Sequence, residues 1–511
     1  MTESATLSWF ARHELTLAWR DWAAMMAGGR TTRERAMTTG TLVFAGLMHL
    51  LAYFVLVPFL KAGVTPDKHA LLILTAMLLF SFSMMLSQAI EHVTRAFYAR
   101  ADLDLILSSP AAAQHLFSVR IAAIAVSGAL MTAVLGAPII NAAAYIDGPK
   151  WLSGYLAIFS MSAIATGLST AATAAMFKAF GPKRTRIIAQ VVAAFVGASL
   201  VIGLQIAAVL YYGNLSRFEI LNSPAVLDAA PAYNSLLWIP ARALLGDLWS
   251  AIALVSAGFF VLTAAIARYA PEFASNAVSS ASVADDLEAR GGGPKPFATR
   301  TTSQALRAKE WLLLRRDPWI LSQSLMQVLY LIPPAILCWK DMGSGTPVHA
   351  VLAPVLVMAF GQLAGGLGWL AISGEDAHDL VATAPITERA RLRAKIESVM
   401  RIIAAVAAPM VLALSFVSLW GAAVTMVGIA ASSATAMTIQ FWFKATAKRS
   451  LFRKRQVATK GATFAEAFSS VFWAAATGFA AAESWFALIF VVFALLSLGA
   501  ARLIRPRETA A

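Results

Sequence analysis

The chain has 511 residues, of which 59% are hydrophobic and only 13% are charged, and its formal net charge is +14. Soluble globular chains carry about a quarter charged residues, so this chain lacks the water-facing surface of a soluble enzyme. Its single cysteine, Cys338, excludes a disulfide framework and a cysteine-based metal cluster within one chain. Basic loops beside anionic lipid account for the positive charge, so we expect no nucleic-acid partner.

Residues 1–35 are polar and basic and lack the apolar core of a signal peptide, so internal spans are expected to target the chain. Beyond them, long apolar blocks recur, each with the length that a membrane-spanning helix needs. Lipid admits only helices and closed barrels, and the blocks are too long for barrel strands. The sequence therefore predicts an all-α polytopic membrane protein with about 12 transmembrane helices. The predicted spans lie near 38–60, 69–91, 117–143, 152–177, 185–212, 247–269, 320–340, 348–372, 397–419, 421–443, 463–481 and 484–503.

The basic residues orient these spans. With an even number of spans, alternate loops share a side with both termini, and that side holds all but six of the 41 Lys and Arg residues. The six exceptions are Lys61, Lys68, Lys150, Arg217, Arg242 and Lys340. The positive-inside rule then places both termini in the cytoplasm, which predicts a multi-pass protein of the bacterial cytoplasmic (inner) membrane.

The chain divides into two halves of similar pattern, a first transmembrane domain at 1–270 and a second at 301–511. Between them, residues 271–300 run from Pro271 through a Ser/Ala-rich stretch to three glycines, a composition typical of a flexible cytoplasmic linker. Because each half has an even number of spans, the halves are predicted to be parallel repeats related by an axis along the membrane normal.

Each half begins with a Glu followed at the same spacing by Arg-Asp, on segments predicted as interfacial helices at 5–24 and 303–318. These residues are Glu14, Arg20 and Asp21 in the first copy and Glu310, Arg316 and Asp317 in the second. On an amphipathic helix of this kind Glu310 is expected to face water and Leu313 lipid. Either the helix transmits force to the next span, or it is a plain membrane anchor; the sequence leaves both open.

A second repeated pattern follows the second span of each half, at 102–113 and 376–388. It comprises Asp104, Leu105 and Pro110, with Arg120-Ile121 beyond, and Asp379, Leu380 and Pro385, with Lys395-Ile396 beyond. Because proline ends or redirects a helix, we expect a short helix across a cytoplasmic loop, suited to docking a soluble partner. The alternative is a simple loop with a helix stop.

Together these patterns resemble ABC-2-type permeases, the membrane subunits of ABC exporters. The resemblance covers most of the chain. It implies that 102–113 and 376–388 are coupling segments and that the interfacial helices are the family's connecting helices. It further implies that ATP and Mg are bound by separate nucleotide-binding ATPase subunits, two per chain. The chain departs from the family in fusing two domains, where most relatives carry one and dimerise. Its outer loop near 213–246 is also long, whereas the counterpart near 481–484 is almost absent.

No phosphate-binding loop, metal-ligand spacing or nucleophile elbow occurs in the sequence, so no catalytic or metal site is expected. His49, the histidine deepest in a span, is interpreted as a lone packed side chain. Polar residues that could line a path or join helices are Asn141, Gln323, Gln327 and Gln362. Charged residues are scarce at span centres, which argues against an ion-coupled secondary transporter. That transporter remains the alternative to an exporter of unidentified substrate, ahead of a lipid-modifying membrane enzyme.

Overall fold

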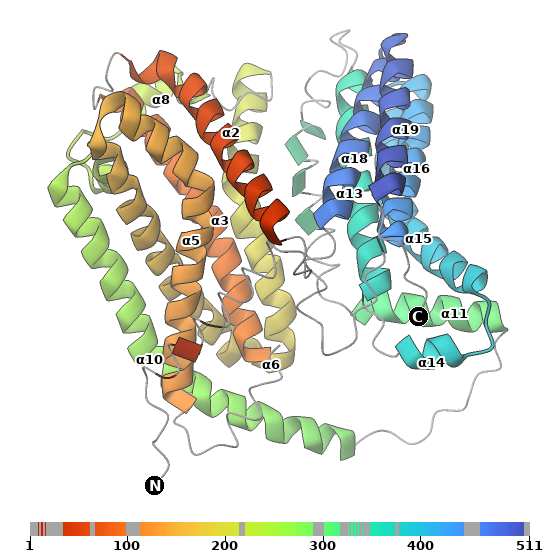
Figure 1. Ribbon diagram of the computed structural model, residues 1–511, viewed down its shortest axis with the longest axis horizontal. Coiled ribbons are helices and arrows are strands. Elements are labelled where there is room, and N and C mark those ends of the chain that lie inside the picture. The colour runs from red at the N-terminus through yellow and green to blue at the C-terminus, as the bar shows by residue number, and fades with distance from the viewer. Residues whose placement is uncertain are drawn as a thin grey trace. The chain divides into compact units, whose positions relative to one another are not determined.

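The computed structural model describes most of the chain and every regular element in its described part is helical (Figure 1). The described residues are 9, 12–13, 16, 34–61, 67–98, 113–213, 220–289, 301–316, 325–326, 329–330, 332–333, 335–336, 340, 348–373, 378–443 and 460–504. The predicted all-helical class is thus confirmed for these residues.

The helices form two compact units, the first built mostly from residues up to Lys295 and the second mostly from residues after it. The first unit contains α2 (Glu34–Leu60), α3 (Lys68–Tyr98), α5 (Ala113–Asp147), α6 (Ser153–Tyr212), α8 (Pro224–Ala229), α9 (Ile239–Leu244) and α10 (Leu248–Ala289). The second contains α11 (Thr302–Arg316), α13 (Val348–Ser373), α14 (His378–Thr383), α15 (Glu388–Ser415), α16 (Leu419–Trp442), α18 (Lys460–Ala481) and α19 (Phe486–Ile504).

Eight helices of the described part are long and apolar enough to cross a membrane. They are Lys68–Thr94, Gln114–Asp147, Pro149–Gly181, Ile187–Tyr212, Leu248–Phe273, His349–Ile372, Glu388–Ser415 and Leu419–Trp442. A helix also lies at each of the other predicted spans except 320–340, most of which is outside the described residues. The chain is therefore a helical, membrane-embedded protein.

Two predicted boundaries differ from the structure, and a third agrees with it. Helix α6 is divided at Gly181, whose φ of 72° and ψ of 169° suit glycine, so the predicted spans 152–177 and 185–212 are separate helices. Helix α10 continues through Pro271 to Ala289, so the first part of the predicted flexible linker at 271–300 is helical. The predicted break at 420–421 lies earlier: α15 ends at Ser415, and Ser418 caps α16 by accepting from the amide of Gly421 at 3.0 Å.

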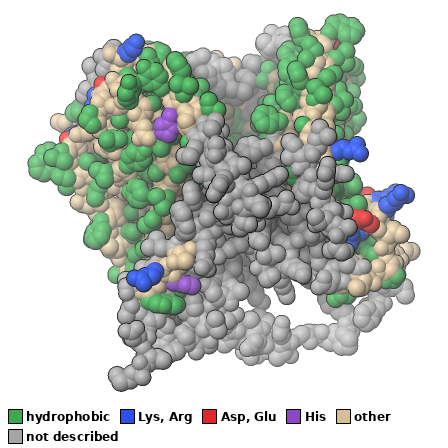
Figure 2. Space-filling view, viewed as in Figure 1, with side chains coloured by type: hydrophobic (Ala, Val, Ile, Leu, Met, Phe, Trp, Pro, Cys, Tyr) green, Lys and Arg blue, Asp and Glu red, His purple; other side chains and the backbone are tan. Residues whose placement is uncertain are grey.

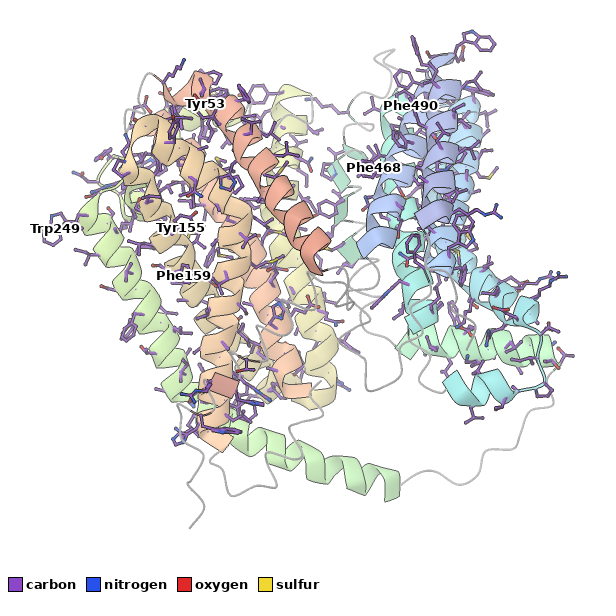
Figure 3. The ribbon with its side chains drawn as sticks, viewed as in Figure 1. Tyr53, Tyr155, Phe159, Trp249, Phe468 and Phe490 are labelled. Atoms are coloured by element: carbon purple, nitrogen blue, oxygen red, sulfur yellow. The ribbon has the colours of Figure 1, made fainter. Side chains whose placement is uncertain are left out.

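The exterior of both units is apolar. Large hydrophobic side chains gather on the visible faces (Figure 2), and Phe54 of α2 and Phe260 of α10 are more than half exposed. At the start of α10, Trp249 points away from its bundle (Figure 3) and is 77% exposed. An apolar exterior this extensive indicates contact with lipid, and a tryptophan at a helix end suits the headgroup level.

The main core cluster of the second unit surrounds α13. Leu363 and Leu367 of α13 are fully buried and belong to a cluster that includes Val399 of α15 and Ile429 of α16. Glycines bring the helices close: a Cβ on Gly428 of α16 would lie 2.8 Å from a methyl group of α13. Small residues at such crossings are the usual means of tight helix packing in membranes.

Candidate functional site

A buried ion cluster joins three helices of the second unit. The Glu310 side chain of α11 is 1% exposed, and its Oε2 accepts from Nζ of Lys395, on α15, at 3.1 Å. Its Oε1 accepts from Nζ of Lys309 at 3.1 Å. Lys395 also donates to the carbonyl of Ala371, near the end of α13. One lysine of α15 therefore links α11 to the end of α13.

The cluster reverses the predicted face of α11. Glu310 and Leu314 are each 1% exposed, and their spacing of four residues puts them on one helix face, toward the bundle. Trp311 and Leu312 are instead 49% and 45% exposed. The expectation that Glu310 faces water was therefore wrong, because a cation on another helix offsets the cost of burying its charge.

A second, more exposed ion pair fixes α11 to α15. Nε of Arg307 lies 2.6 Å from Oε2 of Glu397 as an ion pair, and Arg393 donates from Nε to Oε1 of Glu397 at 2.8 Å. Arg307 and Glu310 of α11 thus face Glu397 and Lys395 of α15 with alternating charge. Two contact points on each helix hold them in a fixed register, so α11 and α15 are expected to move as one body.

The short helix α14 lies at the same end of this unit as α11 (Figure 1). Its Leu380 side chain is 75% exposed. Pro385 is exposed just after the helix ends. Thr387 then caps α15 by accepting from the amide of Ala390 at 3.3 Å. The Asp379 side chain lies outside the described residues. The segment thus presents one apolar side chain on a short helix that leads directly into α15.

Most site residues predicted in the first half lie outside the described residues. They are Glu14, Arg20 and Asp21 of the interfacial segment and Asp104, Leu105 and Pro110 of the coupling segment. Asp317 and the Arg316 side chain, in the second half, are likewise outside. Arg120, which matches Lys395 in the repeated pattern, is described: it lies on α5 and is 3% exposed. A buried cation therefore follows the coupling segment in both halves.

Inside the first unit, three polar side chains from different helices are joined. His49 of α2 donates from Nδ1 to the carbonyl of Ala45 at 2.8 Å, because a carbonyl can only accept. Its Nε2 is then an acceptor for the amide of Asn141, on α5, at 3.1 Å. Tyr155 of α6 donates to Oδ1 of Asn141 at 2.9 Å. Asn141 therefore joins helices, as one of its two predicted roles requires, and His49 is not the lone side chain that we expected.

Gln362 of α13 is half-buried, and Gln323 and Gln327 lie outside the described residues. Sequence reasoning missed Glu466, near the start of α18, which is 7% exposed. It accepts from Nε2 of Gln440, on α16, at 2.7 Å. Charge is scarce at the centres of the predicted spans, whereas Glu466 lies only six residues after Lys460, where α18 begins, so its position suggested an exposed helix end. A carboxylate is therefore buried within the helices of the second unit, which the scarcity of charge at span centres did not predict.

No group of three or more acidic, histidine or cysteine side chains in the described part of the chain could hold a metal ion. Comparison with known proteins gives no match to a family model, a curated protein or a solved structure.

Proposed function

We propose that the chain is the membrane-spanning permease subunit of an ATP-binding-cassette transporter, an exporter of ABC-2 type. In this proposal twelve spans form two parallel six-span repeats in the bacterial cytoplasmic membrane, with both termini inside. Separate ATPase subunits, two per chain, bind ATP and Mg and drive alternating access for an unidentified substrate. The observation that carries the proposal is the buried link from Glu310 through Lys395 to the carbonyl of Ala371.

The link supplies a route for mechanical force. A partner that binds the exposed Leu380 would push α14, and α14 connects to α15 through only four residues, 384–387. Movement of α15 would carry Lys395, and with it α11 through Glu310 and α13 through the carbonyl of Ala371. A push on α14 would therefore be transmitted to α15, and from α15 to α11 and α13 through direct side-chain contacts.

Arg120 supports the same arrangement in the first half. It occupies the repeated position of Lys395 and is buried like it, although a long basic side chain is costly to bury in this environment. A buried cation in a membrane helix ordinarily pairs with another polar group or has a functional role. The recurrence of a buried cation after both coupling segments favours two equivalent sites of contact with ATPase subunits.

Ion-coupled secondary transport is the second candidate, and Glu466 is the observation that favours it. A buried carboxylate within a helix of the membrane bundle is typical of proton and cation pathways. Tandem repeats related by an axis along the membrane normal also occur in such transporters.

Affinity purification from native membranes, combined with site-directed crosslinking, tests the proposal. Leu380→Cys, in a chain whose Cys338 is replaced by serine, should crosslink a soluble protein that contains a phosphate-binding loop. Arg393→Cys, which is also exposed but lies on α15, is the matched control and should crosslink it less. Recovery of the intact chain alone in several mild detergents, with no ATPase at either position, would transfer support to the secondary transporter.

A further inference from the structure

The second unit contains a buried carboxylate that pairs with no cation of the described residues. Glu466 is 7% exposed, and within the described residues its polar contact is the amide of Gln440, with no ion pair. One neutral hydrogen bond does not offset the cost of removing a negative charge from water. Glu310 of the same unit makes the contrast plain, because two lysines contact it.

Glycines on α13 leave the space that the carboxylate occupies. A Cβ added to Gly365 would lie 1.8 Å from Oε1 of Glu466, so the carboxylate fills the place of a side chain there. One turn earlier, a Cβ on Gly361 would lie 2.1 Å from the hydroxyl of Ser432 and 2.8 Å from that of Ser470. Helices α13, α16 and α18 thus meet along a line of polar groups about one helical turn apart.

The two hydroxyls are themselves unusual. Ser432 and Ser470 are 0% and 1% exposed, and neither hydroxyl has a hydrogen-bond partner among the described residues. Buried hydroxyls of membrane helices ordinarily bond to a carbonyl of the preceding turn, as that of Thr477 does with Trp473 at 2.8 Å. Hydroxyls left unbonded about one helical turn from a carboxylate could take part in proton exchange if the side chains or a water molecule bridged that turn.

We propose that Glu466 is an intramembrane proton-binding site that exchanges its proton with water at the α18 end where Lys460 lies. The hydroxyls of Ser432 and Ser470 extend this site one turn further into the membrane. Binding a proton removes the unpaired charge, and the carboxyl group can still accept from Gln440 through its other oxygen. The proposal stands whether or not an ATPase drives the chain.

Among the described residues few other charges face this site, since the described helices that pack most against α18 are α13, α16 and α19. The titratable residue of α13 is His349, which bonds at 3.1 Å to the carbonyl of Ala481, at the opposite end of α18. Helix α16 contains none, and α19 contributes Arg502, whose side chain is exposed at the surface. Lys460 stands at the helix start. Titration in the buried site is therefore assigned to Glu466.

Infrared difference spectroscopy of the full chain in lipid tests the proposal directly. A protonated carboxylic acid has a carbonyl-stretch band that its ionised form lacks. We expect such a band near pH 5 that disappears by about pH 9 and is absent in Glu466→Gln at every pH. Glu483→Gln is the matched control, because Glu483 is an exposed carboxylate just beyond the other end of α18, and it should leave this band unchanged.

A second variant and a change of salt complete the design. Glu466→Asp keeps the carboxyl group and should shift the band, which covers the case in which Glu466→Gln fails to fold. The proposal is overturned if no band depends on residue 466 at any pH, or if the band persists unchanged across the range. It is also overturned if sodium chloride, compared with choline chloride at constant pH, removes the band, because the ligand would then be a metal cation.

Discussion

Replacing Lys395 with methionine isolates the buried ion pair. Methionine is close to lysine in length but has neither the charge nor the hydrogen-bond donor, so Glu310 loses the contact at 3.1 Å while remaining 1% exposed, and the carbonyl of Ala371 loses its donor. Breaking a buried pair by removing one partner costs about 3–5 kcal/mol, because the other charge stays buried. Lys309 still contacts Glu310, so we expect the lower end of that range, about 3 kcal/mol.

The double variant Glu310→Met/Lys395→Met distinguishes the attraction between the two charges from the cost of burying either charge alone. With both charges gone, the carbonyl of Ala371 loses its donor and the partly exposed Lys309 loses its acceptor, so the double variant should lie within about 1–2 kcal/mol of the wild type. The two single changes should then be strongly non-additive, as expected for residues in direct contact. Unfolding of the purified chain in lipid–detergent mixtures, titrated with a denaturing detergent, measures all four corners of the cycle.

Arg393→Gln is the matched control, since its side chain is 79% exposed and it also pairs with a carboxylate. Exposed ion pairs contribute little to stability, so we expect no measurable loss. The reasoning is refuted if Lys395→Met is no more destabilising than Arg393→Gln, or if the two changes at 310 and 395 simply add. Either result would mean that the cluster does not tie the helices together.

Three further predictions follow from other contacts. Leu380→Glu should abolish transport-coupled ATP hydrolysis while the chain still inserts and folds, because the residue is 75% exposed; membrane fractions and reconstituted vesicles measure both. Gly365→Ala should destabilise the second unit by about 1–3 kcal/mol through overpacking against Glu466, as detergent unfolding can measure. The hydrogen bond from Ser250 lowers the pKa of Asp247 below its ordinary 3.8, with a further contribution from Arg242. Asp247 therefore stabilises the fold above that value and loses this effect as the pH falls through its folded pKa, and Ser250→Ala should weaken the dependence in acid unfolding curves.

A control variant or a refuting result belongs to each of these three predictions. Leu412→Glu changes an equally apolar, exposed residue in the predicted lipid belt and should impair insertion, so the same phenotype at Leu380 would exclude a docking role. Gly368→Ala meets atoms only at 3.7 Å and should be tolerated; equal losses at both glycines would contradict the crowding argument. Identical acid unfolding curves for the wild type and Ser250→Ala would contradict the assignment to Asp247.

The helical fold was predictable because lipid leaves few choices. Apolar runs of spanning length must be helical, and helices lie at every predicted span that the structure describes. Breaks between helices were only partly predictable. Four basic residues between 178 and 186 predicted a break, and Gly181 divides α6 there by a sharp kink. The linker predicted to begin at Pro271 is helical at first, because proline bends a helix but does not oblige the chain to leave it.

The candidate site was only partly predictable. The repeated patterns singled out Glu310 and Lys395 separately, but the two are 85 residues apart and nothing local indicates that they meet. An amphipathic pattern assumes that a charge belongs in water, so it placed Glu310 on the wrong face. The hydrogen-bonded triad of His49, Asn141 and Tyr155 was missed because each side chain comes from a different helix.

The two buried carboxylates of the second unit should therefore respond in opposite ways to the same chemical change. Glu310→Gln removes a charge that Lys395 and Lys309 contact, so it strands a buried cation and should loosen α11 from α15. Glu466→Gln mimics the protonated state of a carboxyl that has no cation, so it should leave the unit as stable or make it more stable near neutral pH. Measured side by side, these variants distinguish a group that holds helices together by its charge from one whose charge can be neutralised. If both lost stability equally, Glu466 would be a structural anion like Glu310, and the proton site would have to be abandoned.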